Sequence, residues 1–189
     1  MRNKPVFFTA VALAFGVFVW VVFTNTHKID SSSASTTAGV PTVNDPNNIQ
    51  LLQEILAKEP NNRNAWVQLG HYYCESAQTI PAIEAYGKAL DLDNNDPSIL
   101  AEQGVMFRKL GWFDKAKDNF TKAIEINPSH EHSLYNLGLV YRYDLQDFGK
   151  ATEAWQKFLA LNPTGSEADQ VRWELEFLTN QLSIDKLQQ

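Results

Sequence analysis

The sequence contains a single cysteine, Cys74, among its 189 residues. One cysteine forms no internal disulfide and supplies no cysteine-based zinc cluster. Because free cysteine behaves as a small apolar residue and Cys74 directly follows Tyr73 in an apolar pattern, we expect its thiol to be buried. The alternative interpretation is a thiol exposed in a binding groove.

Basic residues are scarce beyond the first thirty positions. From Ser31 onward the chain carries 13 lysine and arginine residues against 21 aspartate and glutamate residues. Nucleic acids and anionic lipid surfaces both require a basic surface on the protein that binds them. The composition therefore argues against a nucleic-acid partner and against docking of the main domain on anionic lipid.

Motifs for catalysis are absent from the sequence. It has no G-x-S-x-G elbow, no P-loop, no H-E-x-x-H pair and no glycine-rich phosphate loop. His130 and His132 flank Glu131, but two residues this close in a helix point to different faces, which suits shared metal ligation poorly. We interpret them as a loop and helix start, and we expect no catalytic residue, no metal and no cofactor.

The longest stretch without charge is an apolar run at residues 6–23, "VFFTAVALAFGVFVWVVF". Its 18 residues span roughly 27 Å as a helix, which is enough to cross the hydrocarbon layer of a membrane. Bulky residues continue to its end and no small-x-small cleavage site follows, which favours an uncleaved anchor over a cleaved signal peptide. Arg2 and Lys4 precede the run and Lys28 follows it, which favours a cytoplasmic amino terminus. We expect a single-pass inner-membrane protein with its main domain on the periplasmic, extracytoplasmic side.

The stretch after this run, residues 31–48, consists of small and polar residues with two prolines. Such a composition buries no core and is typical of a flexible tether. From Ile49 the apolar residues recur at helical spacing. The predicted division is a cytoplasmic amino terminus at 1–5, a transmembrane helix at 6–23, a linker at 24–48 and a helical domain at 49–189.

The helical domain repeats itself every 34 residues. In its first helices, the residues Trp66, Leu69, Gly70 and Tyr73 recur as Leu100, Gln103, Gly104 and Phe107, and again as Leu134, Leu137, Gly138 and Tyr141. In its second helices, Ala82, Tyr86 and Ala89 recur as Ala116, Phe120 and Ala123, and one residue later than expected as Ala151, Trp155 and Phe158. A single-residue insertion therefore lies within "YRYDLQDFGKA".

This pattern resembles the tetratricopeptide repeat, whose signature is W-x2-L-G-x2-Y, then A-x3-F, then P, every 34 residues. Asn94, Gln103 and Phe158 depart from it without removing a helix. The resemblance implies an all-α fold, a right-handed α-solenoid of three helix pairs at about 63–96, 97–130 and 131–165. A helix at 47–62 would precede the pairs, and a capping helix at 166–182 would close the array, because a solenoid needs covered ends.

In the resembling family the first helix of each pair lines a concave groove that takes extended or helical peptides. Transferring that pattern onto this sequence predicts a partner-binding groove of Asn64, Val67, Gln68, His71, Ser98, Ala101, Glu102, Val105, Arg108, His132, Tyr135, Asn136, Leu139 and Arg142. Tyr135 and Arg142 are the expected anchors, since aromatic residues and arginine dominate interface energies.

Some members of the family grip acidic chaperone termini with a clamp of two lysines, two asparagines and an arginine. This sequence does not reproduce that clamp. Its positions hold Val67, His71, Glu102, His132 and Asn136.

The sequence thus predicts a membrane-anchored module that binds a protein or peptide client. The chain looks similar to the repeat domains of cytochrome c biogenesis factors, which implies assembly or maturation of an exported, cytochrome-like client. The alternative is a structural scaffold that self-associates without a client.

Overall fold

The computed structural model describes residues 46–187, which form helices joined by short turns, without a strand among them. The elements are α1 (Pro46–Lys58), α2 (Arg63–Glu75), α3 (Thr79–Leu92), α4 (Pro97–Lys109), α5 (Phe113–Ile126), α6 (Glu131–Leu139), the π-helical turn η1 (Val140–Asp144), α7 (Phe148–Leu161) and α8 (Ser166–Leu187). The prediction of one leading helix, three helix pairs and a closing helix is confirmed for this part of the chain.

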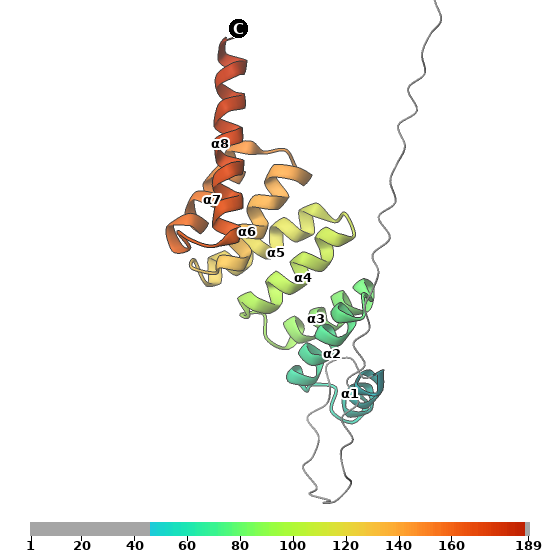
Figure 1. Cartoon of the computed structure of the whole chain (residues 1–189). Helices are drawn as coiled ribbons and strands as arrows, with labels where there is room; N and C mark the ends of the chain where they lie inside the picture. The colour runs from blue at the N-terminus through green and yellow to red at the C-terminus, as the bar shows by residue number, and fades with distance from the viewer. Residues whose placement is uncertain (1–45, 188–189) are drawn as a thin grey trace, which may run out of the picture. The chain divides into compact units, whose positions relative to one another are not determined.

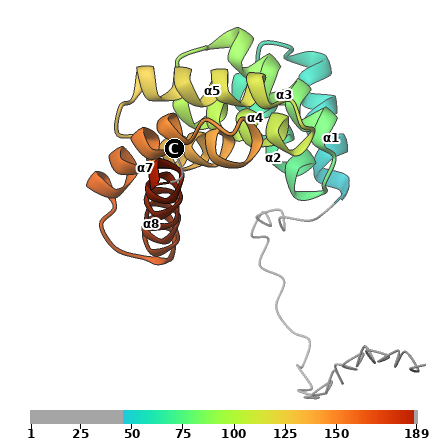
Figure 2. The same cartoon turned by 90° about the horizontal axis from the view of Figure 1, so that it is seen from above.

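Helices that follow one another in the sequence pack against one another. Figures 1 and 2 show α2 beside α3, α4 beside α5, and α6 beside α7, with α1 and α8 at the two ends of the stack. Successive pairs contact each other through α3 and α4 and through α5 and α6. Each pair therefore buries its apolar faces against its neighbours, as a solenoid requires.

Side-chain hydrogen bonds cap the amino-terminal ends of three helices, α2, α4 and α7. The Asn62 side chain accepts a hydrogen bond from the Ala65 amide at 3.1 Å, and the Asp147 side chain accepts one from Lys150 at 3.1 Å. Asp96 accepts from the amides of Ser98 and Ile99, and Pro97 occupies the first turn of α4, where its missing N–H has no cost. These residues set the helix starts that divide the 34-residue unit.

The repeated glycines let each first helix lie against the aromatic residue of its own second helix. A Cβ atom placed on Gly70 would lie 2.5 Å from the Tyr86 ring, and one on Gly104 would lie 2.9 Å from the Phe120 ring. A Cβ on Gly138 would collide with the indole of Trp155. The predicted close approach at these three positions is confirmed.

Gln103, which stands where the other repeats have leucine, is buried and hydrogen-bonded. Its amide donates to the Ile83 carbonyl at 3.0 Å, and its carbonyl oxygen accepts from Asn119 at 2.9 Å. Asn119 also donates to the Leu100 carbonyl. Because each buried polar group finds a partner, the departure from leucine is accommodated at low cost.

The inserted residue of the third unit is absorbed by η1. Backbone bonds join Gln78 to Tyr73 and Trp112 to Phe107 across five residues in the first two units. The equivalent bond in the third unit joins Asp147 to Tyr141 across six residues. A π-turn accommodates an extra residue without breaking the helix, so α7 regains its place against α6.

The predicted membrane anchor at 6–23 and most of the predicted linker lie outside the described residues. Within residues 46–187, no helix combines the length and the apolar character needed to cross a membrane.

Candidate interaction groove

The predicted groove residues lie on the three first helices α2, α4 and α6, with Arg142 on η1. We call the side of the array formed by these helices the first-helix face. Asn64, Gln68, His71, Ser98 and His132 are exposed. The partly buried members are Val67, Glu102, Val105, Arg108, Tyr135, Asn136, Leu139 and Arg142.

Ala101 is an exception, and its assignment to the groove is corrected. Its side chain is only 2% exposed and packs in a core cluster with Phe107, Phe120, Leu137 and Val140. The resemblance to the repeat family implies that Ala101 lies on the groove side, but its short side chain leaves it beneath the surface, where no partner reaches it.

A cleft of about 460 Å³ opens between α4 and α6. It combines apolar Val105 and Phe113 with polar Asn136 and the charged Lys109, Arg108 and Asp144. Mixed linings of this kind suit a segment that presents both apolar and polar side chains.

An ion pair fixes one wall of this cleft. The Arg108 guanidinium donates through Nε to the Asp144 carboxylate at 2.5 Å. Asp144 is the last residue of η1, so the inserted residue helps to set this carboxylate against α4. The pair joins the second helix pair to the third across the first-helix face.

The closing helix α8 engages both expected anchors. The Tyr135 hydroxyl donates to the Gln170 side chain at 3.0 Å, and its ring packs against Phe158. Arg142 donates to the buried carboxylate of Glu174 at 3.1 Å, which also accepts from the Tyr143 hydroxyl. These contacts give Tyr135 and Arg142 a structural role in holding α8, which the sequence pattern did not indicate.

Arg142 is further enclosed by aromatic rings. Its guanidinium carbon lies 5.3 Å from the Tyr143 ring centre, 5.0 Å from that of Phe148 and 5.4 Å from that of Phe177. Stacking on aromatic faces is a favourable setting for a desolvated guanidinium. Burial and the hydrogen bond to Glu174 raise the pKa of Tyr143 to about 12.

The histidine pair occupies a helix start. His130 precedes α6, and its Nδ1 lies 2.8 Å from the Ser133 hydroxyl. Burial lowers the pKa of His130, and the neighbouring His132 lowers it further. Among residues 46–187, no three histidine, cysteine, aspartate or glutamate side chains gather closely enough to hold a metal ion.

The first repeat places Cys74 at the junction of α2 and α4. Its side chain is partly buried and packs on a cluster that contains Tyr86, Ala82 and Met106. Burial raises the pKa of the Cys74 thiol. The expectation of a buried thiol is therefore met only in part.

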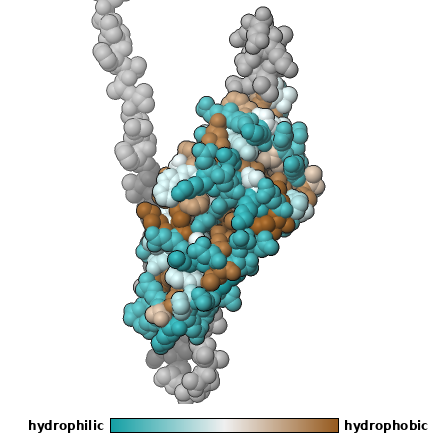
Figure 3. Space-filling view, turned by 180° about the vertical axis from the view of Figure 1, so that it is seen from behind, coloured by the Kyte–Doolittle hydropathy of each residue, from teal (hydrophilic) through white to brown (hydrophobic). Residues whose placement is uncertain are grey.

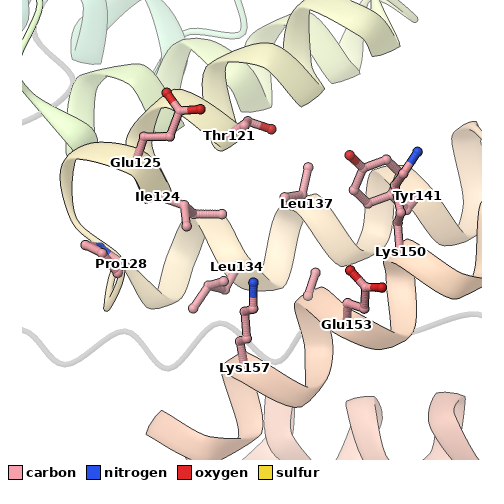
Figure 4. A pocket seen from close by; sticks show the side chains of 11 residues that line it. Thr121, Ile124, Glu125, Pro128, Leu134, Leu137, Tyr141, Lys150, Glu153 and Lys157 are labelled. Carbon is pink, nitrogen blue, oxygen red and sulfur yellow. The ribbon is translucent and has the colours of Figure 1, made fainter.

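Two further clefts lie on the opposite side of the first helices. One, of about 370 Å³, is bounded by α5, α6 and α7, and its apolar lining includes Ile124, Leu134, Leu137 and Ala154. Figure 4 shows these helices around the cleft, with Lys150, Glu153 and Lys157 of α7 at its rim. The other, of about 410 Å³, is bounded by α1, α2 and α3 and includes Leu56, Trp66, Leu69 and Ala85.

These two clefts occupy equivalent places, two repeats apart. In the repeat between them, the buried Gln103 and the partly buried Asn119 stand where the clefts have leucine and alanine. Only a repeat-by-repeat comparison of those positions would have indicated the clefts from the sequence. Figure 3 shows hydrophilic residues over much of one face of the stacked helices, with separate apolar patches among them.

Comparison with known proteins agrees with the geometry. Residues 64–96 and 97–130 each match the family model described as tetratricopeptide repeat. Residues 64–130 therefore carry two matched tetratricopeptide repeats, and they lie within an all-helical solenoid. Solenoids of this kind are in general non-enzymatic scaffolds.

Curated relatives share part of this chain. Photosystem I assembly protein Ycf3 of Prochlorococcus marinus is 33% identical over 100 residues, covering 44% of this chain and 58% of Ycf3. Protein O-mannosyl-transferase TMTC3 of Homo sapiens is 30% identical over 92 residues, covering 48% of this chain and 10% of TMTC3. The chain thus spans less than two thirds of either relative.

Solved structures share the fold. A crystal structure of MamA superposes with a TM-score of 0.63 at 25% identity, covering 70% of this chain and 78% of MamA. The first repeat domain of Spaghetti (RPAP3), solved with the HSP90 peptide SRMEEVD, has a TM-score of 0.55 at 22% identity and covers 77% of this chain and 99% of that domain. The second likeness shows the fold alone.

Proposed function

We propose that this chain is a membrane-anchored interaction module that holds an extended or helical segment of a client protein on its first-helix face. The observation that carries the proposal is the cleft between α4 and α6, where Val105, Arg108 and Asn136 of the predicted groove line one space. A cleft with apolar and charged walls offers both contact area and orientation to a peptide.

The membrane part of the proposal rests on the apolar run at 6–23 and the polar segment after it. Together they would tether the repeats to an inner membrane, on its extracytoplasmic side. The client we propose is an exported protein during assembly or maturation, with a cytochrome-like protein as the specific candidate. The relative Ycf3 is a photosystem I assembly protein, which supports the assembly role.

Site-specific photocrosslinking in membranes tests the groove. A photoreactive residue at Gln68 or Ser98, both exposed on the first-helix face, should yield an adduct with the client, identified by mass spectrometry. The matched control is the same residue at Lys122, which is exposed on α5. Adducts from Lys122 but from neither groove position would refute binding on the first-helix face.

The anchor has its own test. The mature amino terminus, read by mass spectrometry of the membrane fraction, should precede residue 6, and the protein should resist extraction at high pH. A mature terminus beyond residue 24 would replace the anchor with a cleaved signal.

A self-associating scaffold remains the second candidate because of one surface feature. Trp173 and Phe177 stack on each other on α8 with ring centres 5.8 Å apart, and Trp173 is 62% exposed. Exposed aromatic pairs are frequent at interfaces. Sedimentation of the full-length protein and of Trp173→Ala separates the candidates, since only the scaffold predicts concentration-dependent association that the substitution abolishes.

A further inference from the structure

Arg108 and Arg142 occupy the same position in two successive repeats, 34 residues apart. Each guanidinium donates to a carboxylate, Arg108 to Asp144 at 2.5 Å and Arg142 to Glu174 at 3.1 Å. The first arginine lies where α4 meets α6 and η1, and the second lies where η1 meets α8. These two junctions can therefore be compared residue by residue.

The apolar neighbours of the two arginines correspond as well. Val105 and Leu139 each lie three residues before the arginine of their repeat. Phe113 and Phe148 each begin the second helix of their pair, α5 and α7. Both junctions thus combine an aliphatic side chain, an arginine and a phenylalanine, and they differ in what covers this set.

At the junction with α8, aromatic rings enclose the arginine. The Arg142 guanidinium carbon lies 5.0 Å from the ring centre of Phe148 and 5.4 Å from that of Phe177, which belongs to α8. Leu139 and Phe148 pack on a cluster to which α8 contributes buried residues. The Arg142 side chain is left 16% exposed. Here the chain itself supplies the aromatic side chain that covers the arginine.

At the junction of α4 with α6, the corresponding residues Val105, Arg108 and Phe113 line the cleft of about 460 Å³. No aromatic ring among residues 46–187 lies over the Arg108 guanidinium, and the Arg108 side chain is 30% exposed. Within this part of the chain the junction has its carboxylate, Asp144, but no counterpart of Phe177. Clefts of about 300–1,000 Å³ accommodate whole small molecules, so this one has room for an aromatic side chain.

The charges of the cleft indicate a second feature of its ligand. Arg108 and Asp144 neutralise each other, whereas Lys109 also lines the cleft and has an exposed side chain. Lys109 forms no ion pair with any of residues 46–187. Within the described residues the lining therefore has an unbalanced positive charge, which complements an acidic residue in a bound segment.

We infer that the cleft between α4 and α6 binds an aromatic side chain of the client, which an acidic residue flanks in the client sequence. The ring lies against the Arg108 guanidinium, between Val105 and Phe113, because a guanidinium attracts the face of an aromatic ring. It takes the place that Phe177 fills from within the chain at the next junction, and the client carboxylate pairs with Lys109. This inference rests on the proposed function, since it names the chemistry of the segment held on the first-helix face.

Full-length protein in mild detergent, presented with a library of random dodecapeptides, tests the inference. The selected peptides should share phenylalanine, tyrosine or tryptophan at one fixed position, with aspartate or glutamate within one helical turn of it. A benzophenone-bearing phenylalanine at that position should crosslink to Val105 or Asn136 in the cleft, as located by mass spectrometry. Crosslinks confined to the cleft of α5, α6 and α7 would overturn the inference.

Cyclohexylalanine separates the attraction between ring and guanidinium from apolar contact, since it keeps the bulk of phenylalanine and removes the π-electrons. In the selected peptides it should weaken binding about threefold to tenfold. Arg108→Met combined with Asp144→Leu removes the cation without leaving a carboxylate unpaired. In that variant, phenylalanine and cyclohexylalanine peptides should bind equally well. The matched control, Lys122→Ala on α5, should keep the wild-type preference.

The acidic residue has its own measurement. Lys109→Ala should weaken the selected peptides about twofold to fivefold at low salt, the usual effect of an exposed ion pair. Replacing the acidic residue of the peptide by its amide should then cause no further loss. Lys88→Ala, an exposed lysine on α3, is the matched control and should leave peptide affinity unchanged. Equal affinity of wild type and Lys109→Ala would overturn the assignment of the acidic residue.

The outcomes separate this inference from the proposed function. Selected peptides without a shared aromatic residue, or with full affinity after replacement by cyclohexylalanine, would leave the groove standing and overturn the aromatic site. Loss of peptide binding at high protein concentration that Trp173→Ala reverses would show that a second copy fills the cleft, and would also overturn it. Failure of any peptide to bind, together with the absence of client adducts at Gln68 and Ser98, would overturn both.

Discussion

Gly104 lies where α4 crosses α5, with the Phe120 ring directly opposite its missing side chain. A leucine there would drive its Cβ to 2.9 Å from a ring that is itself fully buried. Gly104→Leu should therefore lower the unfolding free energy by about 1–3 kcal/mol or more, as overpacking does. Urea unfolding followed by circular dichroism measures the change.

Gly149→Ala is the matched control for that substitution. A Cβ at Gly149 would meet its nearest neighbour, the Asp147 side chain, at 3.7 Å. Since alanine favours a helix over glycine, this variant should gain about 0.5–1 kcal/mol. Equal stability of Gly104→Leu and wild type would contradict the helix register described above.

Arg142 and Glu174 form the most buried ion pair among the described residues, with side chains 16% and 4% exposed. Arg142→Ala leaves the Glu174 carboxylate buried with only the Tyr143 hydroxyl as donor. The unfolding free energy should fall by about 3–5 kcal/mol, the usual effect of breaking a buried pair. Thermal and urea unfolding of the variant provide the measurement.

The control for Arg142 is Lys88→Ala. The Lys88 pair with Asp91 is exposed on α3 at 3.9 Å, and such pairs contribute about 0–1 kcal/mol. The double substitution Arg142→Met, Glu174→Leu should recover much of the loss, because it removes the stranded charge. A loss in the double variant as large as that in Arg142→Ala would show that aromatic packing, not the charge, dominates.

At the scale of helices, the sequence predicted most of the fold because the 34-residue pattern encodes helix faces, crossings and ends together. Gly70, Gly104 and Gly138 fixed the register before any coordinate was known. The sequence also showed the inserted residue of the third unit, but it did not show whether that residue extends a loop or forms a π-turn. A loop extension and a π-turn have the same length in sequence, and only packing of α7 against α6 selects η1.

The candidate site was predicted less completely, because its contacts join residues that periodicity does not relate. The pattern placed Arg108 and Arg142 on the first-helix face, but it gave no information on Asp144 or Glu174. Asp144 reaches α4 through the non-repeating η1, and Glu174 belongs to α8, which follows no repeat signature. For Ala101 the pattern predicted the helix face but not the burial, because burial depends on the size of the side chain.

The start of α4 links two helix pairs through one carboxylate. Asp96 caps α4 and accepts from Arg63 of α2 at 2.5 Å. Burial raises the pKa of Asp96, but hydrogen bonds from Arg63, Ile99 and Ser98 outweigh it and hold this pKa below its ordinary value of 3.8. At pH 7, Asp96→Ala should cost about 0.5–2 kcal/mol from the cap alone.

Asp96→Asn separates the charge from the cap, since asparagine caps helices about as well as aspartate. Because the folded pKa is lowered, the stabilisation from the charge is present above pH 3.8 and is lost as the pH falls through the folded pKa. The stability difference between wild type and Asp96→Asn should therefore shrink in acid. Urea titrations at pH 7 and below pH 3.8 test this, and a difference that grows in acid would contradict the assignment.

At the scale of the whole helical array, stability depends on its ends. Each repeat buries its faces against neighbours, so loss of an end exposes the next face. Ala168, Val171 and Leu178 of α8 cover a cluster that contains Leu134, Trp155 and Phe158. The carboxyl-terminal end of the array is also where Tyr135 and Arg142 find their partners in α8.

Truncation after Thr164 removes α8 and should uncover that cluster and leave Arg142 without its carboxylate. We expect the melting temperature to fall, the third helix pair to exchange its amide hydrogens before the first, and the protein to aggregate on warming, because exposed apolar patches associate. Hydrogen exchange read by mass spectrometry follows each pair separately. Truncation after Asn180, which retains Ala168, Val171, Glu174 and Leu178, is the matched control and should behave much as wild type does. Uniform exchange across all three pairs in the Thr164 truncation would show that the array unfolds as one cooperative unit and that α8 does not act as a local cap.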